Sequence, residues 1–277
     1  MDEIQSYKDE LVLCAQTVLG QMFNTETSVG ESAVANEDPD RDAIGVAIRG
    51  SLNYCLIFQF SGELSQHLWN QQESNSVPSK QEHIDLLSEV SNQIAGSFKR
   101  ILSSKTDLDL RLSLPQTLTK DEMPVTDGEK RHESINFSSD HGCFNLLIQT
   151  ITSEIKDKFM RFLIVDDAQF MRNLIRKTLT KYGYSDFTEA TSGDEAIDAA
   201  SKEAFDIILM DWNMPVPGID AVKAIRSMGI KTPIVMVTTE GEKMKVIKAV
   251  QAGANNYLIK PFTPDQLKEK IDQVVNK

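Results

Sequence analysis

Five side chains that can handle a phosphoryl group or a metal ion stand at the ends of predicted strands in the second half of the chain. They are Asp166, Asp167, Asp211, Thr238 and Lys260, and each follows a short apolar run. The carboxyl ends of parallel strands meet at one edge of an open α/β sheet, and ligands bind there. A single aspartate at a strand end more often begins a turn, but this matched set favours one shared site.

The residue types indicate the chemistry of that site. Three clustered carboxylates repel one another unless a cation lies among them, and oxygen-only ligands suit a hard cation such as Mg²⁺. A carboxylate can also attack phosphorus and form an aspartyl phosphate. A lysine and a hydroxyl would then stabilise the transferring phosphoryl group. The prediction is Mg²⁺-dependent phosphoryl transfer to a carboxylate.

The elements that must position these groups alternate regularly. From residue 159 on, five apolar strand-like runs alternate with five amphipathic helices, and the last helix begins at Thr263-Pro264. This alternation predicts a doubly wound parallel α/β domain.

Four motifs in this half resemble the receiver domain of bacterial response regulators, and among them the CheY type. The motifs are FLIVDD (162–167), LMDWNMP (209–215), VMVTTE (235–240) and AGANNYLIKPF (252–262). The resemblance covers about residues 158–277. It implies a flavodoxin-like (βα)5 fold with strand order 2-1-3-4-5.

The resemblance also implies roles for individual residues. Asp211 would be the phosphoacceptor. Mg²⁺ would be held by Asp166, Asp167, Asp211 and the main-chain carbonyl of Asn213. The remaining positions are the switch hydroxyl, the switch aromatic and the lysine that contacts the phosphoryl group: Thr238, Tyr257 and Lys260. The Lys260–Pro261 bond is expected to be cis.

The first half contains one long predicted helix, residues 80–102, with a capping box at Ser79-x-x-Glu82. At about 100° per residue, an apolar stripe lies on one face, made of Leu87, Val90, Ile94, Phe98 and Ile101. The opposite face carries Asp85, Glu89 and Asn92. A polar stripe by itself is what any amphipathic helix shows to solvent.

The spacing Asp85-x3-Glu89-x2-Asn92-x22-Pro115 resembles the signature of the CheC/CheX phosphatases of chemotaxis. This resemblance covers about residues 1–152. It implies that Asn92 orients a water toward an aspartyl phosphate and that Glu89 pairs with the receiver lysine. The first helix offers Ser6, Glu10 and then Leu13 in place of the amide, so the single-site CheX type fits better.

These resemblances predict a protein aspartyl-phosphate phosphatase domain fused to a receiver, with a CheA-type histidine kinase as phosphodonor and a phosphorylated CheY-type regulator as partner. A homodimer through the N-terminal domain is a further expectation. Action within one chain, across a dimer or on a separate CheY all remain open. The alternatives are a non-catalytic adaptor, resembling the FliM binding module, and a phosphate sink.

The first half is predicted to be α+β with an antiparallel sheet. Its other helices are expected at about 4–23 and 61–70, and its strands on either side of Gly50-Ser51 and at 107–114, 132–138 and 143–152. The predicted domains are 1–152 and 159–277, joined by a charged linker at 153–158.

Composition narrows the class of protein. The 277 residues carry a net charge of −12, which argues against a nucleic-acid binder. No apolar run is long enough to span a membrane, so no membrane insertion and a cytoplasmic location are expected.

The cysteines Cys14, Cys55 and Cys143 show no disulfide or metal-binding spacing. No C-terminal DNA-binding output domain is expected after residue 277.

Overall fold

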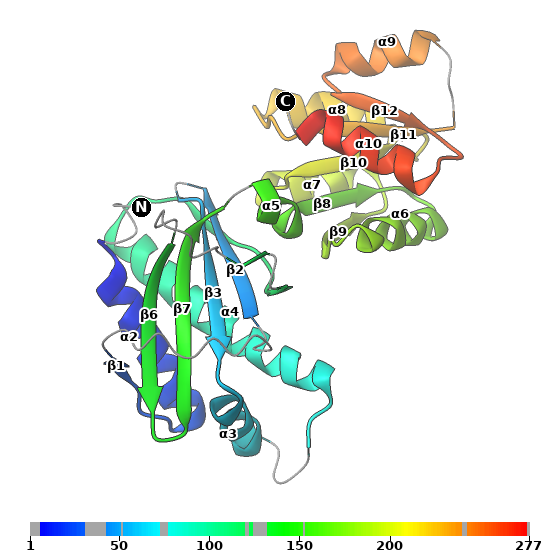
Figure 1. Cartoon of the computed structure of the whole chain (residues 1–277). Helices are drawn as coiled ribbons and strands as arrows, with labels where there is room; N and C mark the ends of the chain where they lie inside the picture. Colours follow the sequence, from blue (N-terminus) through cyan, green and yellow to red (C-terminus); the bar gives the residue numbers. More distant parts are fainter. Residues whose placement is uncertain are drawn as a thin grey trace. The chain divides into compact units, whose positions relative to one another are not determined.

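A computed structural model places most of the chain in two units, residues Met1–Lys156 and Asp157–Lys277 (Figure 1). The structure describes residues 6–30, 43–50, 52–72, 77–119, 122–123, 132–151, 153–239 and 243–275. The predicted linker segment is helical: α5 spans Ser153–Lys156 and a 3₁₀ turn spans Asp157–Phe159. Among the described residues, no helix is both long and apolar enough to cross a membrane.

The first unit is built on one antiparallel sheet of seven strands. The strands are β1 (Ser28–Gly30), β2 (Ala43–Gly50), β3 (Tyr54–Phe60), β4 (Leu110–Leu112), β5 (Gln116–Leu118), β6 (His132–Ser139) and β7 (Gly142–Thr150). Their order is β1-β6-β7-β3-β2-β4, and β5 also pairs with β2. The helices are α2 (Lys8–Phe23), α3 (Gly62–Gln72) and α4 (Lys80–Lys105).

Helix α4 is the longest element of this unit, and it lies against α2, β2, β3 and β4 (Figure 1). Its start is held by the predicted capping box, because the Ser79 side chain accepts from Glu82 N and the Glu82 side chain accepts from Ser79 N at 2.8 Å. One face is buried in the core, and it carries Leu86, Leu87, Val90, Ile94, Ala95, Phe98 and Leu102. Burial of this stripe fixes which face of α4 points outward.

One expectation for the first unit needs correction. The run 107–114 forms not one strand but the short β4, and a second short strand, β5, follows after Pro115. Proline has no N–H to donate to a sheet, and both short strands pair with β2. The sequence pattern does not predict strand β1, whose three residues are exposed and, among the described residues, pair with β6 alone. Residues 1–5, 31–42 and Ser51, on which other expectations fall, lie outside the described residues.

The second unit is a five-stranded parallel sheet. Its strands are β8 (Arg161–Val165), β9 (Asp186–Ala190), β10 (Ile207–Asp211), β11 (Ile234–Thr238) and β12 (Asn256–Ile259). Their order is β12-β11-β10-β8-β9. In chain order within the unit, the sheet therefore runs 2-1-3-4-5.

Helices cover both faces of this sheet. Helices α6 (Gln169–Lys181) and α10 (Pro264–Val275) contribute to one apolar core. Helices α7 (Gly193–Lys202), α8 (Gly218–Ser227) and α9 (Lys243–Ala252) contribute to the other. The central strands β8, β10 and β11 are almost entirely buried, which explains their nearly continuous apolar sequences. The edge strands β9 and β12 are partly exposed and carry more polar residues.

Candidate functional site

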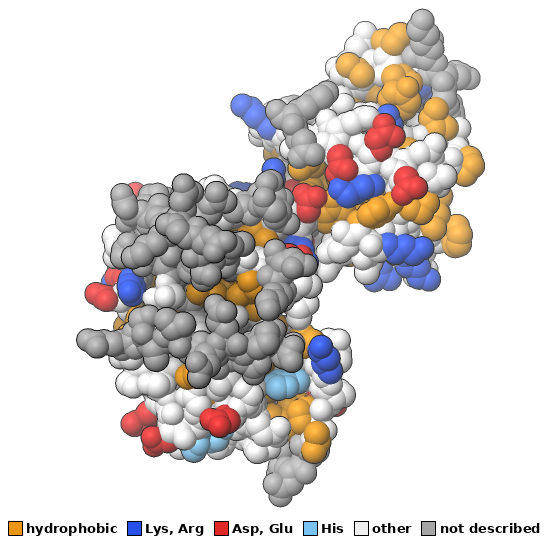
Figure 2. Space-filling model, viewed as in Figure 1, with side chains coloured by type: hydrophobic (Ala, Val, Ile, Leu, Met, Phe, Trp, Pro, Cys, Tyr) orange, Lys and Arg blue, Asp and Glu red, His pale blue; other side chains and the backbone are white. Residues whose placement is uncertain are grey.

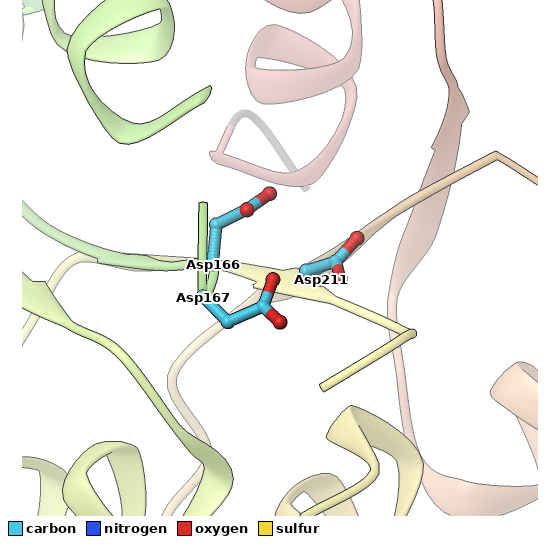
Figure 3. A group of neighbouring side chains, drawn as sticks. All are labelled: Asp166, Asp167 and Asp211. Atoms are coloured by element: carbon cyan, nitrogen blue, oxygen red, sulfur yellow. The ribbon is translucent and has the colours of Figure 1, made fainter. Parts of the chain in front are cut away.

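The acidic residues of the second unit converge at the carboxyl ends of two neighbouring strands. Asp166 and Asp167 follow β8, and Asp211 ends β10, which pairs with β8 in parallel register. Figure 3 shows the three side chains gathered at this edge. One carboxylate oxygen from each lies within 4.8 Å of the others. Asp166 and Asp211 are buried, whereas Asp167 is exposed.

Lys260 neutralises part of this cluster. Its Nζ lies 2.6 Å from Asp166 Oδ2 and 2.7 Å from Asp211 Oδ1. Burial raises the pKa of Asp211 above its usual value, although Lys260 opposes the change. Burial alone would lower the pKa of Lys260, but its hydrogen bonds to the two carboxylates and their charges outweigh this, so the pKa is raised. Lys260 is therefore a cation throughout the physiological range.

Strand β11 completes the same edge. Its last residue, Thr238, is buried, and Thr238 O accepts a hydrogen bond from Lys260 N at 2.7 Å. The β10–β11 register puts Asp211 opposite Val237, the residue before Thr238. The Lys260–Pro261 bond is cis, as the resemblance implied. Tyr257 is partly buried against the core on the α7–α9 side of the sheet.

The loop after β10 is packed against the main chain of Asp211. Asn213 N donates to Asp211 Oδ2 at 3.0 Å, and Asn213 Nδ2 donates to Thr239 Oγ1 at 3.2 Å. A Cβ at Gly218 would lie 1.8 Å from Asp211 O, so only glycine fits there. The loop thus holds the carboxylate of Asp211 in one orientation.

The donor set of this edge fits a magnesium ion. All side-chain ligands are carboxylate oxygens, the donors that Mg²⁺ prefers. Three carboxylates face the single ammonium group of Lys260, so the cluster keeps a net negative charge. The structure brings together every residue predicted for this site except Tyr257, which belongs to the neighbouring core.

Sequence reasoning missed one buried charged residue at this edge. Arg172, in the first turns of α6, is only 9% exposed and bonds to the main chain of the acidic pair. An arginine five residues after Asp167 was the available signal. Nothing in the spacing alone separates it from an ordinary surface arginine.

The predicted phosphatase residues lie on the outward face of α4. Glu89 is exposed, and its Oε1 accepts from Gln93 Nε2 at 2.7 Å. Asn92 is half-buried. Asp85 is exposed and accepts from Gln81 Nε2 at 2.7 Å. Apart from its chain neighbours and the backbone of its own helix, no described residue has an atom within 4 Å of a Cβ built at Gly96, so the helix surface is open at that point.

The related positions on α2 are arranged differently. Glu10 Oε1 lies 2.8 Å from Lys105 Nζ at the end of α4, and its side chain is 20% exposed. Leu13 is exposed. The carboxylate of the incomplete motif is thus already paired within the unit, which agrees with a single site on α4.

On the face of the first unit seen in Figure 2, the described lysine and arginine side chains are scattered among other residues.

Comparison with known proteins identifies both units. The Chemotaxis phosphatase CheX family matches residues 43–138, and the Response regulator receiver domain family matches residues 162–272. Over 120 residues, 42% of this chain, the sequence is 48% identical to the chemotaxis protein CheY homolog of Campylobacter jejuni, covering 92% of that protein. It is 47% identical to chemotaxis protein CheY1 of Helicobacter pylori, covering 97% of it.

Among solved structures, chemotaxis protein CheY4 of Vibrio cholerae aligns with a TM-score of 0.40 at 39% identity, covering 42% of this chain and 98% of its own. The receiver family match covers the domain that carries the carboxylate cluster, and the CheX match includes the motif helix α4. The chain therefore belongs to the CheY-type response regulators through its C-terminal receiver domain, and that receiver is joined to an N-terminal CheX domain.

Proposed function

We propose that Asp211 is the phosphoacceptor of this chemotaxis protein and that the outward face of α4 dephosphorylates an aspartyl phosphate of a CheY-type receiver. The role of Asp211 as phosphoacceptor rests on its buried carboxylate, which is 2.7 Å from Lys260 Nζ. The phosphatase role of α4 is supported by the exposed Glu89 and the half-buried Asn92 on one face of that helix.

In the receiver, a carboxylate oxygen of Asp211 forms a bond to phosphorus while the bond from phosphorus to the donor breaks. Asn213 N, which donates to Asp211 Oδ2, keeps the carboxylate oriented for this attack. The ammonium of Lys260 and the hydroxyl of Thr238 would stabilise charge on the phosphoryl oxygens. Asp166, Asp167, Asp211 and the main-chain carbonyl of Asn213 would hold Mg²⁺, which when bound supplies further positive charge there.

In the CheX domain, the carboxamide of Asn92 would hold a water in line with the phosphorus–oxygen bond of the aspartyl phosphate. The water oxygen bonds to phosphorus and the bond to the aspartate oxygen breaks. Inorganic phosphate leaves with one of the water's protons, and the other proton passes to solvent. Glu89 would pair with the lysine of the receiver under attack and fix the docking. Positioning is the main source of rate in such reactions, so neither residue needs to act as a strong base.

The partners that follow are a CheA-type histidine kinase as phosphodonor and a phosphorylated CheY-type regulator as substrate, in the cytoplasm. A homodimer through the CheX domain is part of the proposal. The substrate receiver would belong to the same chain, to the second chain of such a dimer or to a separate CheY.

The test is the decay of acid-labile phosphate on a free CheY protein, with and without this chain. Asn92→Ala is expected to lower the decay rate about 100-fold, the typical loss when a reacting group is misplaced. Asn70→Ala is the matched control, because Asn70 is another exposed helix amide of the same unit. It should keep the wild-type rate.

If a folded Asn92→Ala variant accelerates decay as well as the wild type, the phosphatase proposal is wrong. Loss of acceleration in the Asn70→Ala control would likewise remove the specific role of Asn92. A wild-type chain that binds phosphorylated CheY without accelerating its decay would identify the CheX domain as an adaptor instead.

A further inference from the structure

Arg172 connects helix α6 to the main chain of the acidic pair. It lies within the first turns of α6 and is 9% exposed. Its Nη1 donates to the carbonyl oxygen of Asp166 at 2.8 Å and to that of Asp167 at 3.3 Å. One guanidinium nitrogen therefore orients two consecutive peptide groups in the turn that carries both carboxylates.

The other side of the guanidinium is fixed as well. Arg172 Nε donates to Glu189 Oε2 at 2.9 Å, from the carboxyl-terminal part of β9. Glu189 Oε1 lies 3.8 Å from Arg176 Nε, one turn further along α6. The charge of Arg172 is thus compensated without drawing on the carboxylates of Asp166 or Asp167. The arginine holds the backbone of the cluster while leaving its ligand oxygens available.

The turn has three further restraints. Asp166 N donates to Ala190 O at 3.2 Å, Ala168 N donates to Asp166 Oδ1 at 2.9 Å, and the Asp166 carboxylate is paired with Lys260. The peptide group between Asp167 and Ala168 is therefore held on both sides, its N–H by Asp166 Oδ1 and its carbonyl oxygen by Arg172. Arg172 also holds the preceding peptide group through Asp166 O. The side chain of Asp167 is exposed, so its carboxylate is directed mainly through the orientation of these two peptide groups.

We propose that Arg172, held by Glu189, is a positioning residue that sets the Mg²⁺ affinity of the site by keeping Asp167 directed toward Asp166 and Asp211. The inference rests on the proposed metal site and names a residue that determines its strength. A planar guanidinium can bond to two carbonyls and a carboxylate at once, which an ammonium cannot do in the same geometry. Groups that orient metal ligands typically change metal affinity 10–100-fold when they are removed.

The experiment measures the Mg²⁺ dissociation constant of the full chain by the fluorescence of Trp212, which adjoins Asp211. Trp69→Phe is the host, so that the signal comes from the receiver alone. Arg172→Gln is expected to raise the dissociation constant by about 10–100-fold. Arg172→Lys is expected to give a smaller increase in the dissociation constant. Lysine keeps a positive charge opposite Glu189, but it lacks the planar guanidinium that bonds to both carbonyl oxygens.

A half-buried arginine of the same domain supplies the matched control. Arg226 donates to the main-chain oxygens of Gly253, Ile230 and Thr232, which precede strands β11 and β12 at the opposite edge of the sheet. Arg226→Gln therefore removes comparable bonds from the same domain. It should lower the thermal midpoint while leaving the Mg²⁺ dissociation constant at the wild-type value.

The outcomes separate the inference from the proposed function. If adding Mg²⁺ to the host protein leaves the Trp212 fluorescence unchanged, both the metal site and the inference are wrong. Binding by the host, with the same dissociation constant in folded Arg172→Gln, would overturn the inference alone. Equal weakening by Arg172→Gln and Arg226→Gln would also overturn it, because the effect would follow from general stability.

Glu189→Gln gives a second route if Arg172→Gln does not fold. Glu189 is about one-third exposed, and its replacement keeps a hydrogen-bond acceptor for Arg172 while removing the charge. An increase in the Mg²⁺ dissociation constant, smaller than that expected for Arg172→Gln, supports the inference. Wild-type affinity in both Glu189→Gln and Arg172→Lys would contradict it.

Discussion

The two candidate sites of this protein are built in opposite ways. The receiver site draws its groups from the ends of several strands and joins them through Lys260, which contacts both Asp166 and Asp211. The α4 face draws Glu89 and Asn92 from one helix, and its inner side alone is committed to the core. The first site is assembled by folding, whereas the second needs only a formed helix and a partner that brings the phosphate.

This difference decides how substitutions should behave. Residues that share hydrogen bonds affect one another when one of them is replaced. The effects of substitutions in the receiver cluster on stability and activity are therefore expected to be non-additive. Groups on the outer face of α4 share few bonds with the core, so their replacement should separate activity from stability. The predictions below test this contrast, beginning with the largest effect.

Replacement of the proposed phosphoacceptor should remove phosphorylation completely. With a small phosphodonor and Mg²⁺, the wild-type chain is expected to gain one phosphate by intact mass, and Asp211→Asn none, because the amide is not a nucleophile toward phosphorus. Asp198→Asn, an exposed position on α7, is the control and should be labelled normally. Phosphate found on another residue of Asp211→Asn would show that the site has been assigned wrongly.

On α4, the inner and outer faces should differ sharply in stability. Phe98 is fully buried, so Phe98→Ala is expected to lower the free energy of unfolding of the CheX domain by about 3–5 kcal/mol through the cavity it leaves. Asn92→Ala should change it by no more than about 0.5 kcal/mol. Denaturant unfolding followed by Trp69, which lies in the same core, measures both. Similar losses in the two variants would contradict the two-faced description of α4.

The smallest predicted effect concerns the start of α4. The hydrogen bonds from the Ser79 side chain and backbone hold the pKa of Glu82 below its ordinary value of 4.5. A lowered pKa in the folded state means that ionised Glu82 stabilises the fold above about pH 4.5 and that this contribution disappears as the pH falls through the lowered value. The thermal midpoints of wild type and Glu82→Gln should therefore differ at pH 7 and converge in strong acid. A difference that persists unchanged at low pH would exclude this origin.

The receiver could be predicted in detail because its local and long-range signals agree. The central strands β8, β10 and β11 are continuous apolar runs that lead directly into Asp166, Asp211 and Thr238, and the run before Asp166 forms β8 with its end at Val165. The parallel arrangement then follows from the intervening helices. Polar groups at successive strand ends could be placed at one edge without any knowledge of their distances.

Other features depend on contacts between segments that are distant in sequence. Strand β1 exists because it pairs with β6, and its three exposed residues carry no alternating pattern. The bond between Arg172 and Glu189 joins α6 to β9, and it becomes visible only when the helix packs on the sheet. The pairing of Glu10 with Lys105 likewise joins the first turn of α2 to the last turn of α4.

That last ion pair bears on how the number of sites in such a domain changes during evolution. A second site on α2 would need an amide at Leu13 and a free carboxylate at Glu10. Leu13→Asn alone would supply the amide beside a carboxylate already bound by Lys105, so it would bring little gain in activity. A two-site version of this domain would therefore need changes on two helices, at Leu13 and at Lys105.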